Sequence, residues 1–187
     1  GRCTWCELLP PYVRAVRSAC WLPGGTAAAI VHALKYDGWT AIADAMALRM
    51  ARLAWPGDVI RERTAVVPVP LAAPRERERG FNQSERLARA LAVEWHCPMW
   101  SSALERRRAT ATQTRLTPED RRRNVFGAFR ALPTAREALR GAHIVLVDDV
   151  ITTGATLSAC AAALLSGGAR IISYVTFGRA PASGDRI

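Results

Sequence analysis

The most regular pattern in the chain is an apolar run at residues 144–147, which ends at two adjacent carboxylates, Asp148 and Asp149. An uninterrupted apolar run of this length is typical of a strand buried on both faces of a parallel sheet. The sequence Thr-Thr-Gly-Ala-Thr follows at residues 152–156, and residues 157–165 are rich in alanine and leucine. The pattern therefore predicts a strand, an acidic pair, a short loop and a helix, in that order.

The same kind of patterning continues along the chain and predicts an α/β fold. Further strands are expected at residues 12–22, 65–69, 125–132 and 170–177, and further helices at residues 26–36, 41–53 and 135–140. We expect Thr26 to cap the first of these helices, because it follows the helix-breaking sequence Pro-Gly-Gly. Strands that alternate with helices favour a parallel sheet with helices packed against it.

The Thr/Gly loop has the composition of a phosphate site. It precedes a helix, whose first backbone amides lack intrahelical partners and lie at the positive end of the helix dipole. Gly154 allows a phosphate to approach the backbone closely, and Thr152, Thr153 and Thr156 add hydroxyl donors. Asp148 and Asp149, which only accept hydrogen bonds when ionised, suit the hydroxyls of a ribose or the water shell of a metal ion. A phosphate and a sugar side by side indicate a phosphorylated pentose.

Two common nucleotide-binding motifs are absent from this loop. It is neither GxxxxGK[ST] nor GxGxxG, which disfavours a P-loop NTPase and a dinucleotide-binding protein. An ordinary strand–turn–helix connection is the structural alternative. That alternative gives no reason for two carboxylates at the end of a buried strand, where they are costly without partners.

A second informative stretch, residues 67–92, again predicts a strand, a loop and a helix, but with cationic chemistry in the loop. The residues that carry this interpretation are Arg75, Arg77, Arg79, the turn residue Gly80, the candidate caps Asn82 and Ser84, and the apolar helix positions Leu87, Ala88 and Leu91. We expect the arginines to meet a second, unpaired phosphate group of the ligand. The alternative is a solvent-exposed charge run, since alternating Arg and Glu often occur on a surface.

The segment VLVDDVITTGAT resembles the signature of type I phosphoribosyltransferases, which bind phosphoribosyl pyrophosphate (PRPP). PVPL followed by RERERGFNQ is similar to the ComF branch of that family, which is associated with DNA uptake in competent bacteria. The resemblance implies a type I phosphoribosyltransferase fold: a mostly parallel twisted sheet flanked by helices, with a small N-terminal hood or zinc-ribbon remnant. It also implies that the acidic pair holds the ribose hydroxyls and that the Thr/Gly loop holds the 5′-phosphate.

The resemblance divides the chain into an N-terminal remnant, residues 1–22, and a phosphoribosyltransferase-like domain, residues 23–187. Cys3 and Cys6 look like the second half of a four-cysteine zinc ribbon, but no second CxxC follows. Cys20 and His32 are the candidate additional ligands. We therefore expect that this chain alone does not hold zinc.

Residues 105–124 are polar and basic and predict a loop, within which a short helix could begin at Pro118 and Glu119. Type I phosphoribosyltransferases have a flexible loop that closes over PRPP, and the resemblance places it here. Its candidate lid residues are Arg107, Arg108, Thr110 and Gln113. The alternative is a surface loop with no part in catalysis.

Composition adds a preference for anionic partners. The chain has 187 residues, a net charge of +10, one lysine (Lys35) and 25 arginines. Arginine binds phosphate in a bidentate fork, so the excess suits a polyanion, although the base composition of the gene explains it equally well. The five cysteines are an odd number and argue against a disulfide framework. No apolar run is long enough for a membrane span, so we expect a cytoplasmic protein without membrane insertion.

The resemblance implies a Mg-dependent transfer of phosphoribosyl from PRPP to a nitrogenous acceptor, with release of pyrophosphate. The expected catalytic residues are Asp148, Asp149, Arg77 and Arg79, and the expected PRPP-binding residues are Asp148, Asp149, Thr152, Thr153, Gly154, Ala155, Thr156, Arg75, Arg77, Gly80 and Asn82. Purine-salvage members usually have an aspartate where this chain has Thr152, so a purine-salvage role is disfavoured and the acceptor stays open. The alternative is a non-catalytic protein of the DNA-uptake machinery that handles single-stranded DNA, together with DNA-uptake proteins, on the same phosphate-binding scaffold.

Overall fold

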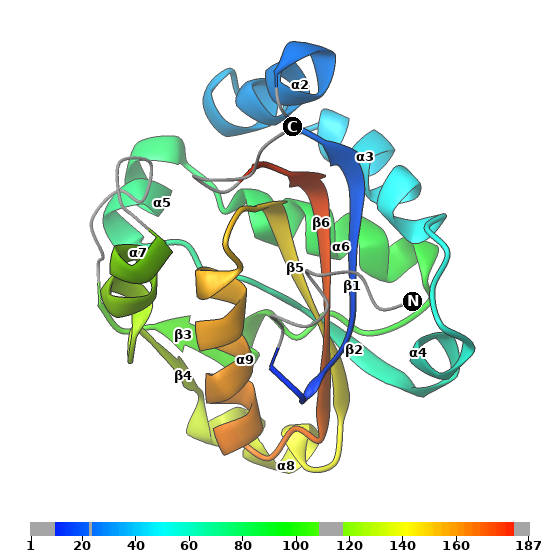
Figure 1. Ribbon diagram of the computed structural model, residues 1–187, viewed down its shortest axis with the longest axis vertical. Coiled ribbons are helices and arrows are strands. Elements are labelled where there is room, and N and C mark those ends of the chain that lie inside the picture. The colour runs from blue at the N-terminus through cyan, green and yellow to red at the C-terminus, as the bar shows by residue number, and fades with distance from the viewer. Residues whose placement is uncertain (1–9, 23, 109–117, 182–187) are drawn as a thin grey trace.

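A computed structural model describes residues 10–22, 24–108 and 118–181. Its centre is a four-stranded, wholly parallel sheet in the order β1-β6-β5-β2. The strands are β1 (Val13–Trp21), β2 (Arg63–Pro68), β5 (His143–Ile151) and β6 (Ile171–Arg179). Figure 1 shows the four strands side by side, with helices in front of and behind them. The predicted α/β fold with a mostly parallel sheet is confirmed.

Successive residues of β5 face two different apolar cores, which explains the uninterrupted apolar run in the sequence. Ile144 and Leu146 belong to one core, while Val145 and Val147 belong to the other, and all four side chains are fully buried. Because side chains alternate across a strand, both faces of the sheet must be covered. This double coverage leaves the ends of the strands as the place where a site can open.

The helices divide between the two faces. One face is covered by α3 (Ile42–Ala51) and α6 (Gln83–Glu94), and α2 (Gly25–Tyr36) packs at the edge of that layer, against α3 and β6. The other face is covered by α9 (Ala155–Ser166) and α7 (Pro118–Val125), together with an antiparallel pair of short strands, β3 (Leu104–Arg106) and β4 (Phe129–Ala131). The short helices α4 (Gly57–Glu62), α5 (Ala73–Arg79) and α8 (Arg136–Leu139), and 3₁₀ turns at Ser101–Ala103 and Pro133–Ala135, connect these elements.

Several local predictions were wrong in detail. Gly24, and not Thr26, is the N-cap of α2, and no side chain caps that helix. The arginine-rich segment after β2 is helix α5 and not a loop, because Pro74 stands in its first turn and Gly80 ends it in the left-handed conformation, with φ 81°. Helix α4 lies between the helix expected at residues 41–53 and the strand expected at residues 65–69, where no element was predicted.

The segment expected to be mainly a loop, residues 105–124, begins with regular structure, since its first residues belong to β3. The short helix expected from Pro118 is confirmed, because α7 begins at that residue. β3 forms because Glu105 and Arg106 pair with Arg130 and Phe129 of β4, a long-range contact that local polarity does not reveal.

The first strand, β1, falls within the predicted N-terminal remnant, residues 1–22. It nevertheless pairs with β6 along most of its length and is an edge strand of the main sheet.

Within residues 10–22, 24–108 and 118–181, we find no helix that is long and apolar enough to span a membrane.

Candidate functional site

A cavity of about 660 Å³ opens where β5 and β2 end, between helices α2, α5 and α6. Figure 1 shows α2 and α5 on the side of the molecule to which the arrowheads of β5 and β6 point. The cavity is lined by Lys35, Tyr36, Gly38, Val69, Pro70, Leu71, Arg75, Glu78, Arg79, Phe81, Gln83, Ser84, Arg106, Asp148, Asp149 and Thr156. Carboxylates from β5 and cations from three other elements thus share one cavity at the carboxyl edge of a parallel sheet, where ligands bind in open α/β folds.

Asp148 lies on the wall of this cavity within β5, paired in register with Thr176 of β6. Its Oδ1 accepts a hydrogen bond from Ser84 Oγ at 2.7 Å and another from the backbone amide of Asp149 at 2.9 Å. Burial of the carboxyl, with the neighbouring Asp149 as the second cause, raises the pKa of Asp148 to about 7. The group therefore changes its charge near neutral pH.

Asp149 is 4% exposed and has partners on both oxygens. Gln83 Nε2 donates to its Oδ1 at 3.3 Å, and Lys35 Nζ forms an ion pair with its Oδ2. The contacts of Lys35, Gln83 and Ser84 with the acidic pair were not predicted from the sequence. The one available signal was that Lys35 is the single lysine among 25 arginines.

Asn82 contacts the backbone inside the protein and is not among the residues that line the cavity, and its role as a PRPP ligand stays a prediction. It is 8% exposed, and its Oδ1 accepts from the Ser84 amide at 3.0 Å, so that it caps α6. Its Nδ2 donates to the carbonyl of Val69 at 3.0 Å. Asn82 thereby holds the start of α6 against the end of β2, which puts Gln83 and Ser84 beside the acidic pair.

The three arginine side chains of α5 do not all point toward the cavity. Arg75 and Arg79 line the cavity, whereas Arg77 is exposed and is not among the lining residues of the described chain. Residues four apart on a helix share a face and residues two apart do not, so the helical conformation itself separates Arg77 from the others. The expectation that Arg77 lies beside Arg75 and Arg79 assumed a loop and was wrong, while its role in catalysis or PRPP binding stays a prediction. Gly80 ends α5 and likewise lies outside the lining.

Arg79 and Arg106 complete the cationic wall. The Arg79 guanidinium lies over the Tyr36 ring, 5.2 Å from its centre, and donates to Gln83 Oε1. Arg106 of β3 lies 5.3 Å from the centre of the Phe129 ring, and burial lowers its pKa. Arg106 enters the cavity only because β3 pairs with β4, so the sequence did not distinguish it from the neighbouring arginines.

The Thr/Gly loop leads from β5 into α9. Gly154 is the N-cap of α9 with φ 74°, a left-handed conformation that favours glycine, and Thr153 Oγ1 accepts from the Ala155 amide at 3.4 Å. Of residues 152–156, Thr156 is the one that lines the cavity in the described part of the chain; Thr152, Thr153, Gly154 and Ala155 form the turn beside it. The predicted strand, loop and helix are confirmed, and the phosphate role of the loop stays a prediction.

The predicted lid residues are only partly described. The Arg107 amide donates to the carbonyl of Ala128 at 2.8 Å. The Arg108 guanidinium donates to the carbonyls of Asn124 and Phe126, so it holds the end of α7. Thr110 and Gln113 lie outside the described residues, and the lid role stays a prediction.

The zinc prediction is also mostly outside the described residues, since Cys3 and Cys6 lie there. Of the candidate additional ligands, the Cys20 thiol donates to the carbonyl of Phe177 at 3.2 Å, and His32 faces Asp37 and the Tyr36 ring. Among residues that the structure describes, no three His, Cys, Asp or Glu side chains gather closely enough to hold a metal.

Magnesium fits the chemistry of the cavity better than zinc does. The donors beside Asp148 and Asp149 are hard oxygens, including the Ser84 hydroxyl. Mg²⁺ is usually held by one or two carboxylates together with substrate phosphates, and not by a cage of protein ligands. Asp148 and Asp149 would be the residues that hold it.

A parallel sheet that ends in paired carboxylates, with a helix N-terminus and arginines around one cavity, defines the class of phosphoribosyltransferase-type proteins. Residues 58–187 match the family described as "Phosphoribosyl transferase domain". The chain is 38% identical over 181 residues to the DNA utilization protein YhgH of Escherichia coli strain K12, covering 92% of this chain and 74% of that protein. It is also 38% identical over 94 residues to Competence protein F of Haemophilus influenzae, covering 50% and 41% of the two chains. A third similar protein is Competence protein ComFC of Bacillus subtilis, 37% identical over 103 residues, or 55% and 39% of the two chains. The chain belongs to the ComF family of phosphoribosyltransferase-like proteins.

Proposed function

We propose that this protein binds PRPP together with Mg²⁺ and transfers its phosphoribosyl group to a nitrogenous acceptor, releasing pyrophosphate. The observation that carries the proposal is that Asp148 and Asp149 line the same cavity as Arg75, Arg79 and Arg106. PRPP carries the matching groups, since its ribose hydroxyls need acceptors and its diphosphate needs cations.

Each part of the cavity has a separate task in this proposal. Asp148 and Asp149 orient the ribose through its hydroxyls, and the start of α9 holds the 5′-phosphate with backbone amides. Arg75, Arg79 and Arg106 attract the diphosphate and stabilise the negative charge that grows on it as the bond from the anomeric carbon to the leaving oxygen breaks. Mg²⁺, when bound, supplies further charge neutralisation on the diphosphate.

The new bond joins the anomeric carbon to a nitrogen of the acceptor, and the nitrogen gives up its proton. The Thr152 hydroxyl is a poor base, so this side chain does not favour an acceptor that needs strong deprotonation. Tyr36, a residue that is 67% exposed and lines the cavity, offers an aromatic side chain beside the place where an acceptor would bind. The identity of the acceptor is left to the experiment below.

Calorimetry with Mg-PRPP tests the proposal directly. The wild type should release or absorb heat with one binding site, and the double variant Asp148→Asn, Asp149→Asn should show none. Purine, pyrimidine and other nitrogen bases, added to the PRPP-loaded protein, then identify the acceptor through pyrophosphate release. Wild-type protein that gives no heat and no thermal shift with Mg-PRPP would overturn the proposal.

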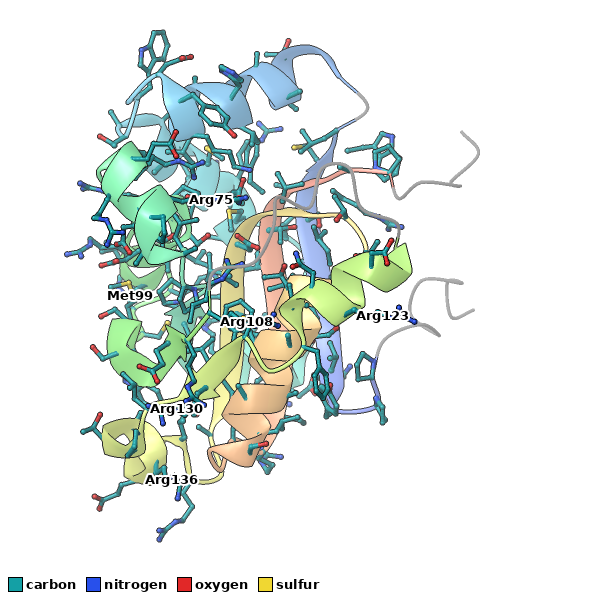
Figure 2. The ribbon with its side chains drawn as sticks, turned by 90° about the vertical axis from the view of Figure 1, so that its left-hand side faces the viewer. Arg75, Met99, Arg108, Arg123, Arg130 and Arg136 are labelled. Atoms are coloured by element: carbon teal, nitrogen blue, oxygen red, sulfur yellow. The ribbon has the colours of Figure 1, made fainter. Side chains whose placement is uncertain are left out.

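A second candidate function is the binding of single-stranded DNA, which the names of the relatives, DNA utilization protein and Competence protein, also suggest. Figure 2 shows Arg108, Arg130 and Arg136 one below another on the face in view, with Arg123 on the neighbouring helix α7. Phe126, at the end of α7, is 83% exposed and could stack on a base. The acidic pair repels a phosphate chain, so the strand would run outside the cavity.

Salt dependence tests this second candidate. Replacing the exposed Arg123 and Arg136 by alanine should lower the slope of log affinity against log salt by about 1–2 for single-stranded DNA. The matched control replaces the exposed Arg52, at the end of α3, and the exposed Arg61 of α4. Equal slopes in both double variants and the wild type would show that Arg123 and Arg136 do not take part in DNA binding.

A further inference from the structure

The ion pair between Lys35 and Asp149 differs from the other carboxylate–cation pairs of the described chain. The Lys35 side chain is 22% exposed and that of Asp149 is 6% exposed, whereas the corresponding values are 42% and 33% for Arg14 and Asp58. Arg170 and Glu62 are still more exposed, at 55% and 45%. Burying two opposite charges costs more desolvation than a surface pair, so stability alone does not account for the lysine.

The pair also occupies the oxygen that a ligand needs. Gln83 already donates to Oδ1 of Asp149, and Lys35 takes Oδ2. Lys35 and Asp149 both line the cavity, so their contact lies at its wall. A cation or a sugar hydroxyl that approaches Asp149 from the cavity therefore meets the Lys35 ammonium first.

The choice of lysine is informative in a chain that otherwise uses arginine for every cationic side chain other than histidine. A guanidinium binds a carboxylate with two parallel hydrogen bonds from a planar fork, whereas an ammonium is a compact charge on a flexible stem. The ammonium is thus close in size and charge distribution to a small cation, and it leaves a carboxylate more readily than a bidentate guanidinium does.

We propose that Lys35 is an internal counter-ion, which holds the cation position beside Asp149 in the ligand-free protein and is displaced when a divalent cation binds there. The proposal rests on the proposed function, in which Asp149 serves the Mg²⁺-bound ligand. Lys35 is the next-to-last residue of α2, so its displacement releases a contact between the end of this helix and the cavity wall. The stacking of Arg79 on Tyr36 is a further contact there.

The test uses Mn²⁺ alone as the probe, with free Mn²⁺ counted by electron paramagnetic resonance. Lys35→Met should bind Mn²⁺ at least about tenfold more tightly than the wild type, because the competing charge a few ångströms away is gone. Lys35→Arg keeps a cation and should not show the gain. Adding Asp149→Asn to Lys35→Met should remove the gain, which locates the ion at Asp149.

Hydrogen exchange of α2 provides a second readout. In the wild type, Mn²⁺ should speed the exchange of amides near the end of α2, and in Lys35→Met the same amides should exchange fast with or without Mn²⁺. A variant that was merely damaged would lose stability without gaining metal affinity. Lys35→Met that binds Mn²⁺ no more tightly than the wild type, including the case in which neither binds it, overturns the proposal.

The two proposals fail in different ways. The Mn²⁺ titration contains no PRPP, and the calorimetry with Mg-PRPP uses only wild type and the acidic-pair variant. Tighter Mn²⁺ binding in Lys35→Met, combined with no PRPP binding in the wild type, would contradict the proposed function alone. PRPP binding in the wild type, combined with no Mn²⁺ gain in Lys35→Met, would contradict the counter-ion role alone.

Discussion

Ser84 Oγ donates a hydrogen bond of 2.7 Å to Oδ1 of Asp148, which joins the first turn of α6 to the end of β5 across 64 positions of sequence. Gln83, the preceding residue, donates to Asp149 in the same way. The acidic pair is therefore oriented by two neighbours on one helix, and that helix is itself positioned by the Asn82 cap. Each of the two neighbouring carboxyl groups thus receives a hydrogen-bond donor from α6, and Asp149 also forms the ion pair with Lys35.

Ser84→Ala should weaken binding of Mg-PRPP at pH 7 by roughly tenfold, because a hydrogen bond to a charged group contributes about 1.5–3 kcal/mol. Without the Ser84 hydroxyl, ionised Asp148 loses a hydrogen-bond donor. A larger fraction of Asp148 is therefore protonated at neutral pH. Calorimetry at pH 7 measures the change. Ser102→Ala, at an exposed position of the 3₁₀ turn, is the control and should bind like the wild type.

Arg75→Ala and Arg77→Ala separate the two faces of α5. Arg75 lines the cavity, so its loss should reduce Mg-PRPP affinity at least about tenfold through a lost charged contact to phosphate. Arg77 is exposed, and Arg77→Ala should change affinity less than about twofold. Equal losses in the two variants would show that the direction of α5 in the ligand-bound protein differs from the one described here.

Gly154→Ala should impair the loop through backbone conformation and not through crowding. A Cβ at Gly154 meets only Ile151 Cδ1 at 3.6 Å, an ordinary contact, but φ is +74°. An alanine there should cost about 1–2 kcal/mol of stability and should turn the first amides of α9 away from the phosphate, weakening Mg-PRPP binding.

Gly141→Ala is the matched control for the loop, since Gly141 has φ +73° and open space around its Cα but lies before β5, away from the cavity. Thermal unfolding should show similar losses of stability in both variants. Calorimetry should show weaker ligand binding in Gly154→Ala alone. A similar loss of affinity in both would mean that the loop conformation is not specific to phosphate.

The stability of the ligand-free protein should depend on Asp148 in a defined pH window. Its pKa of about 7 in the folded protein lies above the ordinary carboxyl value of 3.8, so the folded state holds the proton more tightly than the unfolded chain. This contribution is full below pH about 4 and is lost as pH rises through about 7.

In Asp148→Asn, the melting temperature should therefore decrease less between pH 5 and pH 8 than it does in the wild type. At pH 8 the variant should melt a few degrees higher than the wild type, since about 1 kcal/mol corresponds to roughly 2–4 °C for a protein of this size. Asp44→Asn, at an exposed position of α3, serves as the control and should keep the wild-type pH profile. Melting curves that fall in parallel for wild type and Asp148→Asn would rule out the raised pKa.

Local pattern predicted the parts of the fold that depend on local chemistry. The apolar run of β5, the turn at Gly154 and the alanine-rich helix α9 follow from residues adjacent in sequence, and the structure has them in that order. The same local reasoning failed at residues 73–79. The alternation of Arg and Glu there was interpreted as a loop, although Pro74 and Gly80 delimit a helix. One consequence was the wrong placement of Arg77, since helix and loop direct alternate residues differently.

The sequence by itself determined the class of site, because two carboxylates, a Thr/Gly turn and an arginine cluster must follow buried strands whatever their neighbours are. Tertiary structure alone decided which cations and hydrogen-bond donors lie near the carboxylates. Lys35 comes from α2, Ser84 and Gln83 from α6, and Arg106 from a strand that exists only through its pairing with β4. These contacts join segments that are far apart in the sequence, and they depend on how the helices pack against the sheet. The sequence alone does not give the distances in space between such segments.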